Sequence, residues 1–158
     1  MNQGSSIFVK GQLPAQNLVP NCFCCGLENP AGLRLRFYKE NPETVSTEFT
    51  PPEFWTGWGR MLHGGFHGLL LDETMAWVVF GLLNVKAFVT REMTVRYHRP
   101  VFVEMPLKIF GYLVEDTGRE IRVRGEIQDD NGNVLTSATA TIIRLNQHHM
   151  ETMLAHNN

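Results

Sequence analysis

Apolar and polar residues alternate in the first third of the chain. Residues 33–39 read LRLRFYK, and residues 44–49 follow after an Asn-Pro-Glu turn, so a period of two predicts two strands joined as a hairpin. A loop rich in proline, tryptophan and glycine comes next, over residues 50–61. Residues 62–83 are then largely apolar without alternation, a pattern typical of one helix that is buried on nearly every side.

The period of two returns after Gly81. Val89 and Met93 fall on one face of a predicted strand over residues 89–98, while Thr90 and Glu92 fall on the other face. Residues 102–113, 120–128 and 134–144 repeat this behaviour, and the turns EDTG and DNGN separate the last three segments. The pattern predicts four strands that form an antiparallel meander.

These elements predict an α+β fold, in which one curved antiparallel sheet wraps around one long central helix. The sheet leaves part of the apolar helix uncovered, so we expect a second copy of the chain to cover it in a homodimer, or in a dimer of two such dimers. With 158 residues, the chain has room for one sizeable core. We interpret residues 1–20 as an N-terminal arm, residues 21–146 as the single domain and residues 147–158 as a C-terminal tail.

Charge and hydropathy narrow the set of partners. A formal net charge of −2 provides no basic field for nucleic acid or an anionic membrane surface, so we expect neither partner. The longest apolar run contains His67, Asp72 and Glu73, which a membrane-spanning helix hardly tolerates. The first residues lack the basic and then apolar pattern of a secretory signal, and we therefore expect a cytoplasmic location.

Three cysteines, Cys22, Cys24 and Cys25, cluster in the stretch NCFCCG. An odd and tightly spaced set is a poor disulfide framework, which favours free thiols. Cys22 and Cys25 form a C-x-x-C pair of the kind that begins many zinc sites, but the sequence contains no second pair. We interpret the cysteines as small buried residues beside a turn, and the sequence predicts no metal and no organic cofactor.

The stretch LHGGFHGLLLDETMAW, residues 62–77, brings polar chemistry into the buried helix. Gly64 and Gly65 stand at its beginning, where main-chain amides lack internal acceptors and the helix dipole is positive. Open amides at this position suit the oxyanion of an acyl-transfer reaction. The same glycines also permit a sharp entry from loop to helix. The residues alone leave both interpretations open.

Asp72 is predicted to share a helix face with small residues. At about 100° per residue it lies about 20° from the direction of Gly65 and close to Gly68, whereas Glu73 points about 80° away and is either a supporting acid or a rim residue. A carboxylate among small residues suits a face that a ligand or another backbone approaches. Asp72 lies about 12 Å along the axis from Gly64, so two antiparallel helices across a two-fold axis are needed to bring acid and amides together.

Two histidines accompany these groups. His63 and His67 are four residues apart, a spacing that binds metals on a helix, but no third ligand has suitable spacing. His63 is predicted to precede the helix, where it caps the entry or orients a substrate carbonyl, with a structural role as the alternative. His67 faces away from Asp72 and is predicted to be structural.

Three stretches, CFCCGLENPAGLRLRF, GWGRMLHGGFHGLLLDETMAW and TREMTVRYHRPV, resemble the hotdog-fold acyl-CoA thioesterases, in particular the phenylacetyl-CoA thioesterase-like branch. The resemblance covers about residues 21–145. It implies a hotdog fold, active sites between paired subunits, and hydrolysis of an acyl-CoA to a free acid and CoA. It also implies that the amide of Gly64 or Gly65 polarises the thioester carbonyl. Asp72 of the partner chain would then activate water or attack directly, and His63 would position the substrate.

One position departs from this branch. Its members often carry an Asn six residues before the motif His, where this chain has Gly57, so an Asn that holds the attacking water is not carried over. The resemblance suggests that CoA lies along the dimer surface, where Arg91, Arg96 or Arg99 would meet its phosphates, with an ordinary solvated strand charge as the alternative for each.

The loop before the motif supplies aromatic candidates for an acyl pocket. Phe54, Trp55 and Trp58 are candidates to line or cover an apolar or aromatic acyl group, with ordinary loop packing as the alternative. Gly57, beside Trp58, is also counted among the substrate-binding candidates. Two other functions stay open beside the thioesterase. One is a hotdog hydratase or dehydratase that pairs a His with an acid, and the other is a module that binds acyl thioesters without catalysis.

Overall fold

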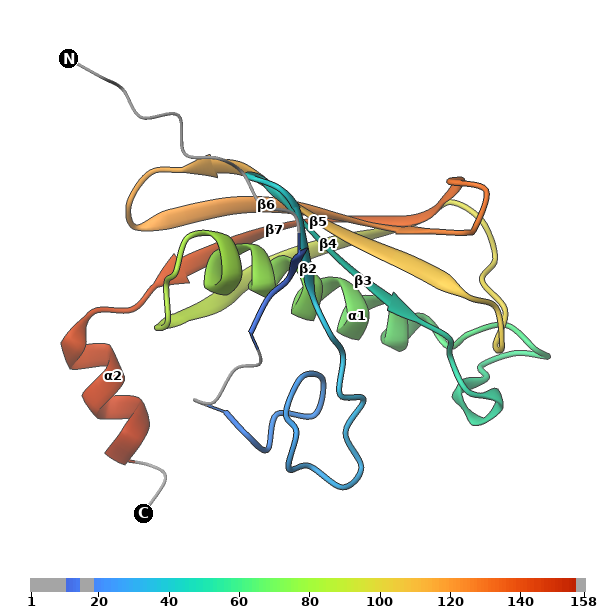
Figure 1. Cartoon of the computed structure of the whole chain (residues 1–158), viewed down its shortest axis with the longest axis horizontal. Coiled ribbons are helices and arrows are strands. Elements are labelled where there is room, and N and C mark those ends of the chain that lie inside the picture. Colours follow the sequence, from blue (N-terminus) through green and yellow to red (C-terminus); the bar gives the residue numbers. More distant parts are fainter. Residues whose placement is uncertain (1–10, 15–18, 156–158) are drawn as a thin grey trace.

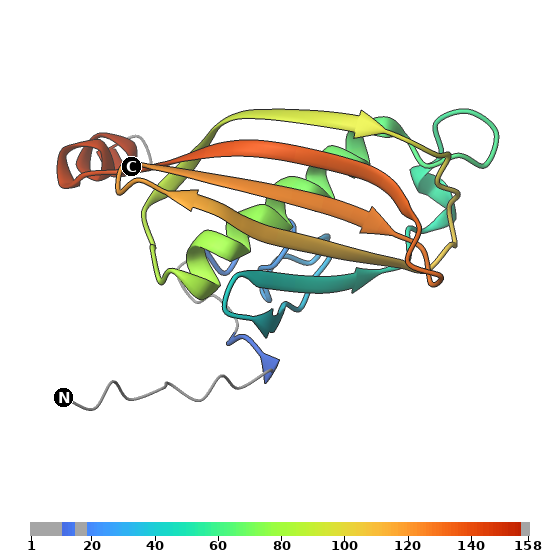
Figure 2. The same ribbon diagram turned by 90° about the horizontal axis from the view of Figure 1, so that it is seen from above.

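The computed structural model describes residues 11–14 and 19–155. Its strands form one antiparallel sheet in the order β1-β2-β3-β5-β6-β7-β4, and Figures 1 and 2 show this sheet curving along helix α1. The predicted α+β arrangement, one curved sheet around one long helix, is confirmed. The strands are β1 (Gly11–Gln12), β2 (Tyr38–Asn41), β3 (Thr44–Phe49), β4 (Phe88–Tyr97), β5 (Leu107–Asp116), β6 (Glu120–Gln128) and β7 (Val134–Arg144).

Helix α1 (Gly64–Trp77) carries the centre of the core. It follows the short turn η1 (Glu53–Trp55) and continues into the π-helical turn η2 (Val78–Leu82). Leu70, Leu71 and Met75 are fully buried against the concave face of the sheet. Gly111 permits the close approach of helix and sheet, because a Cβ there would lie 2.8 Å from the carbonyl oxygen of Thr74.

The predicted meander is correct for β5, β6 and β7 but wrong for β4, which lies at the edge of the sheet beside β7. The reason is that α1 crosses the concave face between β3 and β4, so the chain emerges at the far side of the sheet (Figure 2). Residues 98–106 then return and bring β5 beside β3. The strand predicted over residues 102–113 begins only at Leu107, because the preceding residues pair with the loop before α1, through Leu62 N to Val101 O at 2.8 Å and Val103 N to Arg60 O at 3.0 Å.

The first predicted strand is also shorter than expected. The alternation over residues 33–39 is real, since Leu35 and Phe37 are buried between exposed or half-buried neighbours, but the strand begins only at Tyr38. Leu35 N instead donates to Cys24 O at 2.9 Å, and Arg34 has a φ of 53°, which interrupts an extended chain. This segment therefore pairs with the cysteine-containing loop rather than with a strand.

The chain ends differ from simple tails. Strand β1, within the predicted N-terminal arm, pairs with β2, while residues 1–10 and 15–18 of that arm lie outside the described residues. Helix α2 (Gln147–Leu154) forms within the segment interpreted as a C-terminal tail, and Asn146 caps its beginning by accepting from His149 N at 2.9 Å. The division into arm, domain and tail stays a prediction. Within the described residues, no helix has the length and apolar character needed to cross a membrane.

Candidate active site

A groove of about 500 Å³ runs between α1 and β4, and we call it the α1–β4 groove. Gly65, Gly68 and Asp72 line it together, as their helical spacing predicts. The strand side contributes acidic, basic and hydroxyl groups. The complete lining is Gly65, Gly68, Leu69, Asp72, Thr90, Arg91, Glu92 and Met93. The small-residue face of α1 is thus open at the surface of the single chain.

Asp72 is half-buried in this groove and is held by the neighbouring strand. Thr90 Oγ1 donates a hydrogen bond of 2.9 Å to Asp72 Oδ1. Among the described residues, Asp72 Oδ2 has no hydrogen-bond donor. The carboxylate therefore has one fixed oxygen and one oxygen available to a ligand, an arrangement suited to a general base or nucleophile.

The beginning of α1 has the geometry expected of an anion-binding helix end. His63 is its N-cap, and His63 Nδ1 accepts from Gly65 N at 3.1 Å. Within the part of the chain that is described, the amide of Gly64 has no acceptor. Because Nδ1 accepts, the neutral imidazole carries its proton on Nε2, which leaves an N–H donor directed elsewhere. His63 thus caps the helix, as one of its two predicted roles requires.

A second hollow, of about 430 Å³, lies beside this helix end and we call it the entry hollow. Gly64, Tyr97 and Arg99 are among its lining residues, and Tyr97 Oη donates to Gly64 O at 3.0 Å. Arg96 is exposed on β4 and does not line this hollow, and neither does Asp72. In one chain, Gly64 and Asp72 therefore line different hollows, although Gly65 shares the α1–β4 groove with Asp72.

The aromatic loop divides into buried and exposed residues. Trp55 is buried and stacks on Phe66 with ring centroids 3.9 Å apart, so it belongs to the core. Phe54 and Trp58 are 82% and 83% exposed, and they line neither hollow of this chain. Gly57 lies directly against His63, since a Cβ at Gly57 would meet His63 Cα at 3.1 Å. A larger side chain at Gly57 would displace the capping histidine.

Glu73 lines neither hollow, whereas His67 lines the entry hollow together with Gly64. Trp77 Nε1 donates to Glu73 Oε1 at 3.1 Å, and Glu73 lies against Cys25 rather than in the α1–β4 groove. Burial raises the pKa of Glu73 above its ordinary value. His67 is buried with Nδ1 2.8 Å from Thr136 Oγ1, and burial lowers its pKa. This environment fits the structural role predicted for His67.

Sequence reasoning did not single out Thr90 or Tyr97 as site residues. Both lie on β4, and their contacts with α1 depend on β4 taking the edge position beside the helix. No local signal in the sequence encodes that placement.

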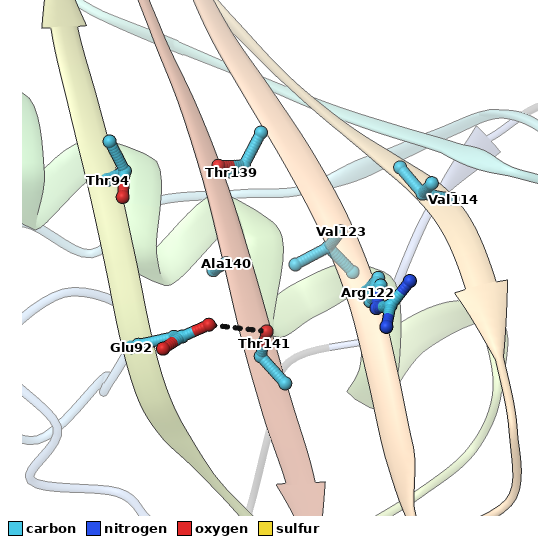
Figure 3. Close-up of a pocket in the computed structure, with 8 residues that line it drawn as sticks. All are labelled: Glu92, Thr94, Val114, Arg122, Val123, Thr139, Ala140 and Thr141. Carbon is cyan, nitrogen blue, oxygen red and sulfur yellow. Dashed lines mark hydrogen bonds between the residues drawn. The ribbon is translucent and has the colours of Figure 1, made fainter.

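Another hollow, lined by Glu92, Arg122 and Thr141 among others, lies on the opposite face of the sheet, with α1 behind the strands (Figure 3). It contains none of the predicted site residues.

Comparison with known proteins indicates the class. The sequence profile of the thioesterase superfamily matches residues 59–136, a range that contains all of α1 and β4. Together with the fold, this match supports assignment of the chain to the thioesterase superfamily of hotdog-fold proteins. No curated protein matches the chain.

Solved structures support the same assignment. A thioesterase superfamily protein is 27% identical with a TM-score of 0.71, over 78% of this chain and 60% of that protein, so the chain spans only part of its length. A hypothetical thioesterase from Streptococcus pneumoniae, solved with coenzyme A, is 20% identical with a TM-score of 0.65, over 72% of this chain and 87% of that one. The PaaI protein of the Escherichia coli phenylacetic acid degradation operon is 16% identical with a TM-score of 0.61, over 65% and 73%. The last two likenesses concern the fold alone.

Proposed function

We propose that the protein hydrolyses an acyl-CoA thioester to a free acid and CoA, at two equivalent sites between the subunits of a homodimer. The observation that carries this proposal is the pairing of two features on one helix. Asp72 is held by Thr90 in an open groove, and the Gly64 amide is free at the positive end of the same helix. The match to the thioesterase superfamily favours this chemistry over other uses of the fold.

The homodimer follows from the separation of these groups. Gly64 and Asp72 are about 12 Å apart along the helix axis and line different hollows, so a complete site needs a second helix that runs in the opposite direction. Strand β4 supports such a dimer, because within the described residues it pairs with β7 only and its other edge is open along ten residues. Pairing of two β4 edges across a two-fold axis extends the sheet and brings the two α1 helices side by side.

The chemistry assigns one task to each group. Asp72 of one chain takes a proton from water as the water oxygen bonds to the thioester carbonyl carbon, or attacks that carbon directly. The Gly64 amide of the other chain donates to the oxyanion that forms, and His63 Nε2–H provides a second donor. The carbon–sulfur bond then breaks, and CoA leaves as a thiolate that takes up a proton. When water is the nucleophile, the free acid forms in this step. When Asp72 attacks directly, the acyl group stays on its carboxylate as a mixed anhydride, which water then hydrolyses to the free acid and the restored carboxylate.

The remaining candidates bind the two ends of the substrate. Arg99 lines the entry hollow beside Gly64, and the exposed Arg96 lies on the same strand end, so both are proposed to meet CoA phosphates. The pneumococcal relative solved with coenzyme A supports a CoA thioester as substrate. Phe54 and Trp58, exposed in one chain, are proposed to cover the acyl group at the dimer interface.

The proposal is tested by thiol release from a panel of acyl-CoAs with short, long and aromatic acyl groups. Asp72→Asn should lower kcat by about a hundredfold or more, while Asp130→Asn, on the exposed turn between β6 and β7, should leave it unchanged. Equal activity of Asp72→Asn and the parent would remove Asp72 from the mechanism. Binding of acyl-CoA without any thiol release would instead favour an acyl-thioester-binding module.

A further inference from the structure

Three side chains that bind transition metals meet at one point outside both hollows. One thiol sulfur from Cys22, one from Cys25 and one carboxylate oxygen from Glu73 all lie within 4.8 Å of one another. The two cysteines come from the loop before β2, and Glu73 comes from the middle of α1. Tetrahedral coordination with metal–ligand bonds of about 2.0–2.3 Å places ligand atoms about 3.3–3.8 Å apart, so the three atoms need to approach one another by about 1 Å or less to hold one ion.

The cysteine loop is built to hold both thiols on one side. Gly26 N donates to Cys22 O at 3.0 Å, which closes a tight turn around Cys25. Only glycine fits directly after Cys25, because a Cβ on Gly26 would lie 2.3 Å from Pro20 O and 2.5 Å from Cys22 N. A C-x-x-C pair in a tight turn is the usual way in which one loop presents two sulfur ligands to zinc.

The third ligand, Glu73, is held by a core residue as well as by its contact with Cys25. Trp77 Nε1 donates to Glu73 Oε1 at 3.1 Å, and the Trp77 ring stacks on Phe37 with centroids 4.5 Å apart. The carboxylate is therefore oriented by packing within the core before any ion arrives. Preorganised ligands of this kind lose little conformational entropy when they bind a metal.

The cluster contains two thiols and one carboxylate but no basic side chain. None of the ion pairs found among the described residues involves Glu73. The carboxylate is thus open to a divalent cation, which would displace the two thiol protons as it binds.

We propose that Cys22, Cys25 and Glu73 bind one thiophilic divalent transition metal ion, with Zn²⁺ as the ion of choice. Two sulfur ligands select zinc-like ions over Mg²⁺ and Ca²⁺, which prefer oxygen. The two thiols release their protons on binding, and water completes the tetrahedron. The sequence predicts no metal, because the ligand that completes the set lies about fifty residues further along the chain.

The ion would act as a clip between the cysteine loop and α1. Cys22, Cys25 and Glu73 line neither the α1–β4 groove nor the entry hollow, so substrate would not reach the metal there. The ion is expected to raise the stability of the fold and to fix the position of α1. Asp72 is the residue directly before Glu73 on this helix. This inference does not depend on the proposed hydrolysis.

Cobalt provides the test, because Co²⁺ bound by thiolates has charge-transfer and d–d absorption bands that report sulfur ligands directly. The reduced, chelator-treated protein should bind one equivalent of Co²⁺ with these bands, and Zn²⁺ should displace the cobalt and raise the Tm. Cys22→Ser and Cys25→Ser should each lose the bands. Glu73→Gln should weaken binding by about tenfold or more. The matched control is Cys24→Ala, a neighbouring buried thiol outside the cluster, which should bind cobalt as the parent does.

The unsubstituted protein alone can overturn the proposal, so the test does not depend on variants that fold. Absence of thiolate bands in the reduced protein at excess Co²⁺, together with no change of Tm by Zn²⁺, would rule out the site. Bands that persist in Cys22→Ser, or that vanish in Cys24→Ala, would contradict the ligand set. A protein that binds no cobalt but readily forms a Cys22–Cys25 disulfide would identify a redox pair instead.

Discussion

Replacement of Gly64 by proline removes one main-chain N–H and little else. Gly64 is the first residue of α1, with His63 as the N-cap, and proline is favoured at this helix position. His63 already has φ −60° and ψ 132°, an extended conformation of the kind that the residue before a proline adopts. We therefore expect Gly64→Pro to fold with an unchanged helix.

The size of the effect follows from what that amide does. In the free protein the Gly64 amide has no acceptor among the described residues, so its loss removes no existing hydrogen bond. In the proposed transition state it donates to the oxyanion, and loss of one such donor costs about 3 kcal/mol, or about 100- to 1000-fold in kcat. The Gly65 amide is no substitute, because it already donates to His63 Nδ1.

Gly64→Ala is the matched control. A Cβ at this position lies 3.3 Å from Tyr97 Oη, and both variants introduce that contact, but only alanine keeps the N–H. Thiol release should therefore be slow in Gly64→Pro and near the parent rate in Gly64→Ala, with similar Tm values for both. Equal rates in the two variants would refute the assignment of the Gly64 amide as an oxyanion donor.

Two further predictions concern the surroundings of the site. Thr90→Val removes the hydrogen bond to Asp72 Oδ1 and should lower kcat by about tenfold without a matching rise in KM. The control Thr94→Val, at an exposed position on the same strand, should leave kcat unchanged. Equal losses of kcat in the two variants, measured by steady-state kinetics, would contradict this role of Thr90. Burial holds the pKa of His67 below its ordinary 6.5, so the unfolded chain takes up a proton first as the pH falls. The free energy of unfolding is then fully retained above about pH 6.5 and falls by up to about 1.4 kcal/mol per pH unit below it. Urea unfolding of His67→Gln should lack this part of the pH slope, and an identical slope would show that His67 does not cause it.

The sequence predicts most of the fold because its strands and helix have clear periodicities. The strands at residues 44–49, 120–128 and 134–144 have the bounds that the alternation indicates. The order of strands in the sheet is less accessible. Alternation reports which face of a strand is buried and not which neighbour it pairs with, so the edge position of β4 had to come from the structure.

In the candidate site, too, some relations between residues are predictable from the sequence and others are not. Groups on one helix, such as Gly65 and Asp72, were related correctly because helical geometry fixes their directions. Contacts between residues of different elements are not predictable in this way. Thr90 against Asp72 and Glu73 against Cys25 are contacts between segments far apart in the sequence, and no local spacing encodes them.

The central claim, a site shared between two chains, is tested most directly by mixing two inactive variants. Gly64→Pro and Asp72→Asn homodimers are dissociated, mixed in equal amounts and allowed to reassociate. Random pairing yields about half heterodimers, each with one intact site that joins the Asp72 of one chain to the Gly64 amide of the other. The account predicts that thiol release recovers to about a quarter of the parent rate. No recovery, in a mixture where heterodimers are shown to form, would contradict the shared site.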